Sequence, residues 1–245
     1  MFDHVTIRVT GRAASEAFYG AVLGALGIQS TTSSQSFVEW DDFSLTEAAA
    51  GKPVTRRLHV GFVAPTREHV DEFWRVGIAG GFHDAGRPGE RPQYKPDYYG
   101  AFLLDPDGNS VEAVHHGSLR TGGIIDHVWL RTTDIAASRR FYAVVALSAG
   151  LRIRELGPDH VQVVGSSGSF SVVPGPPTCG LHMAFPASTN AAVDEFHHAL
   201  TGAGYRDDGP PGERPVYHSG YYGAFVLDPD GNSVELVNHN RGAGG

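Results

Sequence analysis

The sequence is poor in cysteine and in long apolar runs. Cys179 is the one cysteine among 245 residues, which excludes an internal disulfide and a thiolate cluster for zinc. Any metal must therefore be bound by nitrogen and oxygen atoms. No apolar segment approaches the length that spans a membrane, and the N-terminal stretch MFDHVTIRVT enters a strand pattern without the basic start of a signal peptide. We expect a cytoplasmic location without membrane contact.

Positive charge is also scarce. Lys and Arg number 19 against 27 Asp and Glu, which gives a formal net charge of −8, and no stretch gathers the basic residues. This balance argues against a surface for nucleic acid or anionic membranes, so we expect a small molecule as the partner. The apolar content of 41% is sufficient for a proper hydrophobic core.

The chain is a tandem repeat with a constant offset of 123 residues. Residues 125–133, IDHVWLRTT, repeat the pattern FDHVTIRVT of residues 2–10. A longer stretch, GAFLLDPDGNSVEAVHH from Gly100, returns almost unchanged as GAFVLDPDGNSVELVNH. An internal period of this kind fixes the architecture. We therefore predict two copies of one domain, residues 1–120 and 121–245.

Each half alternates strand-type and helix-type patterns in the same order. The run DPDGN supplies the fixed φ and the positive φ that a tight reversal needs, and so predicts a hairpin. Because strands dominate and helices are too few for a parallel sheet, we predict an α+β fold in which mixed sheets curl around a cavity. The predicted strands are 3–9, 36–40, 43–47, 58–63, 102–104, 110–114, 126–131, 160–164 and 169–173, and the predicted helices are 13–26, 66–78 and 135–147.

Three polar residues interrupt the predicted strands at equivalent positions of both halves. A single strand histidine is usually a hydrogen-bonded core residue, and a single strand glutamate is usually solvated. Two imidazoles and a carboxylate that recur together instead suit a divalent metal and leave positions open for a substrate. The candidate ligands are His4, His59 and Glu112 in the first half and His127, His182 and Glu235 in the second.

Histidine at the start of the first and fifth strands, and the DPDGN hairpin leading to glutamate, make each half resemble the vicinal oxygen chelate superfamily. That group includes glyoxalase I, extradiol ring-cleaving dioxygenases and metal-free bleomycin-resistance proteins. The resemblance covers nearly the whole chain and implies paired βαβββ modules that form a cup. It implies the ligand sets His4, His59, Glu112 and His127, His182, Glu235, or else sets shared between the halves, such as His4, His182 and Glu235.

The activity that the resemblance implies is bidentate chelation of a substrate with two neighbouring oxygens, with the cation stabilising the charge that develops. Dioxygenases of the superfamily carry a histidine before the acid hairpin, which His218 matches, and a tyrosine within it, where this chain has Phe225. The first half has Lys95 and Phe102 at these places. We therefore expect a glyoxalase-type lyase or isomerase slightly ahead of a dioxygenase, with Fe²⁺, Mn²⁺, Ni²⁺ or Zn²⁺ bound. A metal-free drug-binding resistance protein is the alternative outside catalysis.

Other residues shared by the halves are candidates for the pocket. An arginine beside tyrosines can bind a substrate carboxylate or phosphate bidentately, or it can pin a loop. A histidine four residues beyond each glutamate lies on the same strand face. We expect catalytic roles for His218, Tyr99 and Tyr222, and substrate contacts from Arg91, Arg214, Tyr98, Tyr221, His116 and His239.

Two residues make the halves unequal. Glu47 lies near the place of a fourth protein ligand in glyoxalase-like members, but the offset puts Phe170 opposite it, and we expect Glu47 to be solvated. The other is His218. Because Glu47 and His218 make the two pockets chemically unequal, they leave open that one half is catalytic and the other a structural relic. Two fused copies can satisfy a pairing that one-domain relatives achieve by dimerising, so we expect a monomer or a homodimer.

Overall fold

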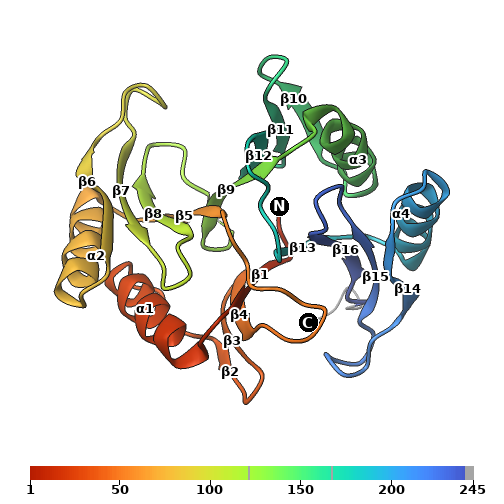
Figure 1. The fold of residues 1–245 in the computed structure, drawn as a ribbon, viewed down its shortest axis with the longest axis horizontal. Helices are drawn as coiled ribbons and strands as arrows, with labels where there is room; N and C mark the ends of the chain where they lie inside the picture. The colour runs from red at the N-terminus through yellow and green to blue at the C-terminus, as the bar shows by residue number, and fades with distance from the viewer. Residues whose placement is uncertain (121, 167, 241–245) are drawn as a thin grey trace.

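The computed structural model describes residues 1–120, 122–166 and 168–240. Within these ranges the chain forms two eight-stranded mixed sheets and four helices, which confirms the predicted α+β class. Both sheets cross the middle of the molecule, and the helices lie toward its two ends (Figure 1).

The first sheet joins the start of the chain to its end. Its strand order is β14-β15-β16-β13-β1-β4-β3-β2, with β1 antiparallel to β13. The strands are β1 (His4–Val9), β2 (Thr32–Ser33), β3 (Phe37–Trp40), β4 (Phe43–Glu47), β13 (His182–Pro186), β14 (Asp207–Glu213), β15 (Tyr222–Leu227) and β16 (Ser233–Asn238).

The second sheet is built from the middle of the chain. Its strand order is β10-β11-β12-β9-β5-β8-β7-β6, with β5 antiparallel to β9. The strands are β5 (His59–Val63), β6 (His83–Glu90), β7 (Tyr99–Leu104), β8 (Ser110–His115), β9 (Ile125–Thr132), β10 (Arg152–Glu155), β11 (Val161–Val164) and β12 (Ser169–Pro174).

Each sheet therefore combines one βαβββ module from each half of the chain. The two modules of one half do not pair with each other, which corrects the within-half ligand sets. Each module has an edge strand whose backbone N–H and C=O groups can pair with another module. Because β1 and β9 have similar sequences, pairing within a half or between halves satisfies the same backbone hydrogen bonds.

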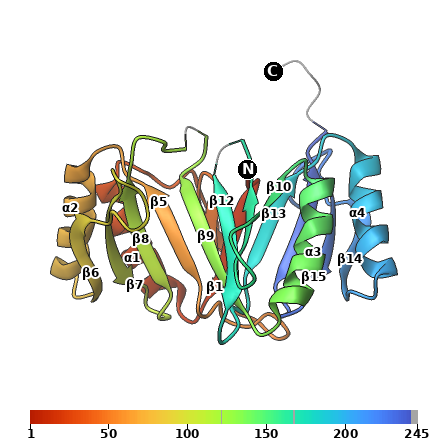
Figure 2. The ribbon, with the colours of Figure 1, turned by 90° about the horizontal axis from the view of Figure 1, so that it is seen from above.

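The helices pack in two pairs. Helices α1 (Arg12–Ala25) and α2 (Arg67–Ala79) contact each other at one end of the molecule, and α3 (Ile135–Ser148) and α4 (Asn190–Gly202) do so at the other. Figure 2 shows the two pairs flanking the central strands. Among the described residues, none of the helices is both long and apolar enough to cross a bilayer.

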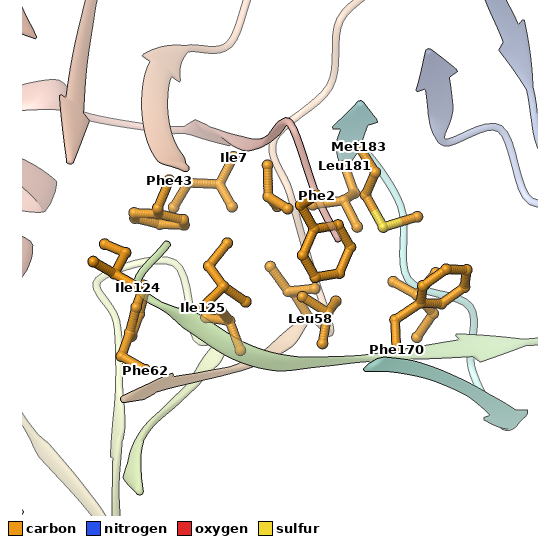
Figure 3. Packing of buried hydrophobic residues seen from close by; sticks show 14 of the residues in the cluster. Phe2, Ile7, Phe43, Leu58, Phe62, Ile124, Ile125, Phe170, Leu181 and Met183 are labelled. Atoms are coloured by element: carbon orange, nitrogen blue, oxygen red, sulfur yellow. The ribbon is translucent and has the colours of Figure 1, made fainter. Parts of the chain in front are cut away.

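Alternation along the central strands separates core residues from polar ones. In β1, His4, Thr6 and Arg8 are half-buried on one face, whereas the residues between them are buried on the other. The buried faces of both sheets contribute to one hydrophobic cluster (Figure 3). Within it, Phe43 and Phe62 pack edge to face with ring centroids 5.0 Å apart. We name the opposite, polar face of each sheet the first cup and the second cup.

The DPDGN turn is held by its own first aspartate. Oδ1 of Asp105 accepts hydrogen bonds from the backbone N–H of Asp107 (2.9 Å) and of Asn109 (2.8 Å). The hydroxyl of Tyr19 on α1 donates to Oδ2 of the same carboxylate at 2.9 Å. The turn glycine takes a φ of +84°, which favours glycine. These bonds fix the start of β8, the strand that carries Glu112.

Candidate metal centres

Each cup holds one cluster of two histidines and one glutamate. In the second cup the two Nε2 atoms are 3.0 Å apart, and Oε2 of the glutamate lies 3.1 and 3.3 Å from them. In the first cup the corresponding distances are 3.1 Å between the nitrogens, and 3.1 and 3.7 Å to the carboxylate. We name His4, His182 and Glu235 the first centre, and His59, His127 and Glu112 the second centre.

This spacing fits one divalent cation bound by all three groups. Metal–nitrogen bonds of ~2.1 Å at about 90° place two nitrogens about 3.0 Å apart. Two imidazole nitrogens that face each other at this distance otherwise need a proton between them. Glu112 and Glu235 are each only 1% exposed, so each carboxylate needs a compensating positive charge in the cup. A metal supplies that charge, and iron, manganese, nickel and zinc all accept nitrogen and oxygen ligands.

The six predicted ligands come together in the sets shared between halves. The set His4, His59 and Glu112 is wrong, because the last two belong to the second sheet and the first belongs to the first sheet. The set His127, His182 and Glu235 is wrong for the same reason, because the first belongs to the second sheet and the other two belong to the first sheet. Each fifth-strand histidine and its glutamate come from one half, since β5 and β8, like β13 and β16, are parallel neighbours. The first-strand histidine comes from the other half.

An aspartate directly before each first-strand histidine orients that ring. Nδ1 of His127 lies 2.8 Å from Oδ2 of Asp126, and Nδ1 of His4 lies 2.8 Å from Oδ1 of Asp3. A carboxylate only accepts, so Nδ1–H donates, and Nε2 presents a lone pair to a metal once it has lost its own proton. Sequence reasoning missed these aspartates, although the triplet DHV in both copies was a visible signal.

A buried tyrosine orients each glutamate. The hydroxyl of Tyr98 donates to Oε1 of Glu112 at 2.7 Å, and that of Tyr221 donates to Oε1 of Glu235 at 2.6 Å. Oε2 is therefore left to face the histidines. Burial and the neighbouring carboxylate raise the pKa of both tyrosines, so they stay protonated. The predicted substrate contact is corrected, because both hydroxyls are used by the glutamates.

Burial and hydrogen bonding oppose each other at the second centre. Burial disfavours the charged form of Glu112, but hydrogen bonds from His127 and His59 outweigh it and lower the pKa to about 2. Burial also disfavours a charged His127, but its bonds to Asp126 and Glu112 raise the pKa to about 9. Burial lowers the pKa of His59. Without metal, the raised pKa of His127 therefore favours its charged form at neutral pH.

The first centre shows the same division between its two histidines. Burial disfavours the charged form of His4, but its hydrogen bond to Asp3 and the charge of Glu235 raise the pKa above the ordinary value. Burial lowers the pKa of His182. In each centre the first-strand histidine thus has the raised pKa and the fifth-strand histidine the lowered one.

Glycine makes room for each glutamate. A methyl group at Gly100 would lie 2.6 Å from Oε1 of Glu112, and one at Gly223 would lie 2.6 Å from Oε1 of Glu235. Distances below 3.0 Å are essentially never seen for a side-chain carbon, so the carboxylate would have to move. These two strand positions need glycine for the close approach of a ligand.

Tyr99 and Tyr222, which we expected to be catalytic, point away from the centres. The hydroxyl of Tyr99 donates to Asp71 of α2, and that of Tyr222 donates to Asp194 of α4, each at 2.8 Å. Neighbouring residues of a strand face opposite sides of the sheet. The catalytic assignment is wrong, because each tyrosine next to the one that contacts the glutamate is turned toward a helix.

The two repeated arginines pin their own loops. Nη2 of Arg91 donates to the backbone oxygen of Arg87 at 2.7 Å, and Nη2 of Arg214 donates to that of Pro210 at 2.6 Å. The guanidinium of Arg91 also lies 5.8 Å from the ring centroid of Phe102. These contacts favour loop pinning, the second of our two interpretations, over the predicted substrate contact.

His218 reaches the first centre only through other side chains. Its Nε2 lies 2.8 Å from Nδ1 of His239, whose Nε2 lies 2.7 Å from Oδ2 of Asp3. In the second cup, Nε2 of His116 lies 3.3 Å from Oδ1 of Asp126. The predicted substrate contacts of His116 and His239 are corrected, because both rings contact the orienting aspartates instead.

Glu47 lies away from the first centre. It is exposed at the end of β4, and its Oε1 accepts a hydrogen bond from the backbone N–H of Arg12 at 3.3 Å, which agrees with the expected solvated glutamate. Its structural counterpart is Pro174, because Glu47 pairs with Val9 and Pro174 pairs with the equivalent residue of β9. The constant offset, which put Phe170 at this place, fails here.

A cavity of about 520 Å³ lies beside the first centre. Its lining includes Arg8, Lys52 and Arg206, together with acidic residues of β14 and the second DPDGN turn. Ser233, another lining residue, is the strand partner of His182. Arg8 lies on the same face of β1 as His4, so the cavity lies in the first cup and has a charged wall.

A family model matches both halves of the chain. The model is described as the Glyoxalase/Bleomycin resistance protein/Dioxygenase superfamily and covers residues 1–113 and 124–236. The chain belongs to this superfamily. A search of curated protein sequences found no match. The resemblance read from the repeated histidines and the acid hairpin is confirmed.

Two solved structures share the fold over almost the whole chain, and a third matches about half of it. Glyoxalase I from Zea mays has a TM-score of 0.69 at 16% identity, over 97% of this chain and 92% of its own. A putative dioxygenase from Bacillus subtilis subsp. subtilis str. 168 has a TM-score of 0.65 at 14% identity, over 98% and 86%. A glyoxalase/bleomycin resistance protein from Albidiferax ferrireducens T118 is 35% identical over 47% of this chain and 98% of its own, with a TM-score of 0.41.

Proposed function

We propose that the protein is an enzyme that binds a divalent metal in each centre and transforms a small substrate through two neighbouring oxygens. The observation that carries this proposal is the convergence of two histidines and a buried glutamate in both cups, with all three donor atoms within 4.8 Å of one another. A metal-free binding protein gains nothing from a buried carboxylate between two histidines, because burying that charge is costly. Complete clusters in both cups favour catalysis over sequestration.

The residues around each centre prepare it for this chemistry. When bound, the cation stabilises negative charge that develops on substrate oxygens. Asp126 and Asp3 hold the first-strand histidines in the tautomer that presents Nε2. Tyr98 and Tyr221 hold one oxygen of each glutamate and leave the other for the metal. Three protein ligands leave the remaining positions free for two substrate oxygens.

Within this class we infer a glyoxalase-type lyase or isomerase slightly ahead of a ring-cleaving dioxygenase. The ring of Phe102 lies 6.0 Å from that of His59, and the ring of Phe225 lies 5.9 Å from that of His182. The aromatic ring beside each fifth-strand histidine is therefore a phenylalanine, which has no phenolic hydroxyl to move a proton. Enolate chemistry on a hydroxycarbonyl substrate needs only the cation and one base.

Metal content per chain tests the proposal most directly. We expect near two metals in the wild type purified without chelator or histidine tag, and one fewer in each of Glu112→Ala and Glu235→Ala, measured by plasma mass spectrometry. No metal after anaerobic reconstitution with iron, manganese, nickel and zinc would contradict the enzyme proposal. Tight small-molecule binding unaffected by a chelator would then support the metal-free binding protein.

A second pair of assays separates the two reactions. Deuterium uptake from solvent into α-hydroxycarbonyl compounds reports an enolate, and we expect it to require the loaded metal. Oxygen consumption with catechols reports ring cleavage. Oxygen uptake without any deuterium exchange would reverse our order of the two reactions.

A further inference from the structure

The two cups differ at one position beside each centre. Trp129 lies two residues after His127 in β9, so both side chains share the face of the second cup. The equivalent residue of the first cup is Thr6 in β1. We propose that Trp129 is a stacking platform that makes the second centre prefer ligands with a planar apolar group beside the chelating oxygens. The proposal rests on the metal-dependent function proposed above.

Strand register places Trp129 next to a metal ligand. Trp129 and His59 are partners in the antiparallel pair of β9 and β5. In the first cup, Thr6 and His182 are partners in the pair of β1 and β13. Residues directly opposite each other have Cβ atoms about 4.5–5.5 Å apart on the same face. The indole therefore stands beside the second centre where a small hydroxyl stands beside the first.

The neighbours of Trp129 and of Thr6 also differ between the two cups, aromatic in one and polar in the other. Trp129 is 36% exposed, and one of its neighbours is the ring of His160, with centroids 5.1 Å apart. The indole keeps free surface on the face of β9 that carries His127, where a flat ligand group can cover it. In the first cup, Oγ1 of Thr6 lies 2.8 Å from Oγ of Ser44, a hydrogen bond that leaves a short polar floor. The first cup therefore offers no aromatic surface at this place.

A matched pair of probes tests the preference without catalysis. Acetohydroxamate and benzohydroxamate both chelate a metal through two neighbouring oxygens and differ only in a methyl or a phenyl group. Glu235→Ala retains the second centre and Glu112→Ala retains the first, so each can be titrated alone after zinc loading, by calorimetry. We expect the ratio of benzohydroxamate to acetohydroxamate affinity to be about tenfold higher at the second centre than at the first.

Substitutions at the platform assign the preference to one side chain. In the Glu235→Ala background, Trp129→Thr should lower the ratio to that of the first centre, and Trp129→Phe should keep most of it. In the Glu112→Ala background, Thr6→Trp should raise the ratio, which tests the proposal independently of how Trp129→Thr folds. Metal content is measured on every variant.

The outcomes separate this inference from the proposed function. Equal ratios at the two centres, or a ratio unchanged by both Trp129→Thr and Thr6→Trp in metal-loaded protein, would overturn the stacking platform alone. Failure of the protein to load metal or to bind either hydroxamate would contradict the proposed function on which the platform rests.

Discussion

At the scale of single residues, the two histidines of each centre are not equivalent. His127 is held between Asp126 and Glu112, so its proton is retained, whereas His59 has a lowered pKa because it is buried. His4 and His182 repeat this difference in the first centre. The orienting aspartate is the cause, because it contacts only the first-strand histidine of each pair.

Replacing Asp126 by asparagine should weaken metal binding at the second centre by about 10–100-fold. The neutral amide no longer fixes the Nδ1–H tautomer of His127 or raises the basicity of its Nε2. Competition with a chromophoric chelator measures the effect. Asp3→Asn is the matched control and should weaken the first centre alone. Equal losses at both centres in either variant would contradict this assignment.

The raised pKa of His127 predicts opposite pH dependences for the metal-free and the loaded protein. The pKa of about 9 lies above the ordinary 6.5 of histidine. Its stabilising contribution to the metal-free protein is therefore complete below pH 6.5 and is lost as pH rises toward 9. Metal must displace the same proton, so affinity at the second centre should rise by up to about tenfold per pH unit over this range.

Two measurements check these opposite trends. Denaturant melts of chelator-treated protein should show stability falling between pH 6.5 and 9, and zinc titrations of Glu235→Ala should show affinity rising. His127→Asn serves as the control, since it should flatten the stability profile over this window. A zinc affinity that does not change with pH would show that His127 holds no proton in the metal-free centre.

At the scale of elements, the hairpin of β7 and β8 combines a fixed turn with a crowded interior. Asp105 fixes the turn, and Gly100 lies against the glutamate ligand on the neighbouring strand. The hairpin of β15 and β16 repeats this arrangement with Gly223. In each hairpin, the turn thus positions the strand that carries the glutamate, and the glycine on the neighbouring strand leaves space for the glutamate side chain.

Gly100→Ala should abolish metal binding at the second centre while the first centre stays loaded. The new methyl group would lie 2.6 Å from Oε1 of Glu112, so the carboxylate would be displaced. Metal content by plasma mass spectrometry should fall from two to one per chain. Gly20→Ala is the control, because α1 has open space there, and it should keep both metals and raise stability by about 0.5–1 kcal/mol. Full metal content in Gly100→Ala would contradict the crowding argument.

Residue patterns predicted the elements that pack on the core and missed those that do not. The predicted strand 43–47 coincides with β4, and the other predicted strands and helices overlap observed ones because their apolar residues alternate with the correct period. Strands β2, β6, β10 and β14 were missed. All four are edge strands with mostly exposed residues, where no burial pattern is imposed on the sequence.

The six residues of the candidate centres could be singled out from the sequence, but their grouping into two centres could not. All six ligands interrupt apolar strands at repeated positions, which made them visible. Their grouping depends on which edge strands pair, and the similar sequences of β1 and β9 permit either choice. Tyr99 and Tyr222 were misassigned for a related reason, since adjacent tyrosines in both copies gave no signal of which one faces the glutamate.

At the scale of the whole molecule, each centre needs both halves of the chain. We propose that residues 1–120 and 121–245 are the two duplicated units, although each sheet draws on both. A fragment of residues 1–120 has His4, His59 and Glu112, but these lie on different sheets in the full chain. One copy alone therefore completes neither centre.

The isolated fragment 1–120 should dimerise. Two copies can pair β1 of one with β5 of the other, as β1 pairs with β13 and β5 with β9 in the full chain. Sedimentation equilibrium should give a dimer, and metal analysis should give two ions per dimer. Glu112→Ala in the fragment should remove the metals and leave the dimer. A stable monomer that binds one metal would contradict this prediction.

The two-to-one division of ligands between halves has a consequence for inheritance. If either half were replaced by that of a homologous chain, one candidate ligand of one centre and two of the other would change at once. The two centres therefore cannot be inherited separately. A mutation that alters the pairing of β1 with β13, or of β5 with β9, also alters the geometry of the residues in one centre and is selected for or against through that change. Because each centre takes its residues from both halves, the two centres form one heritable unit.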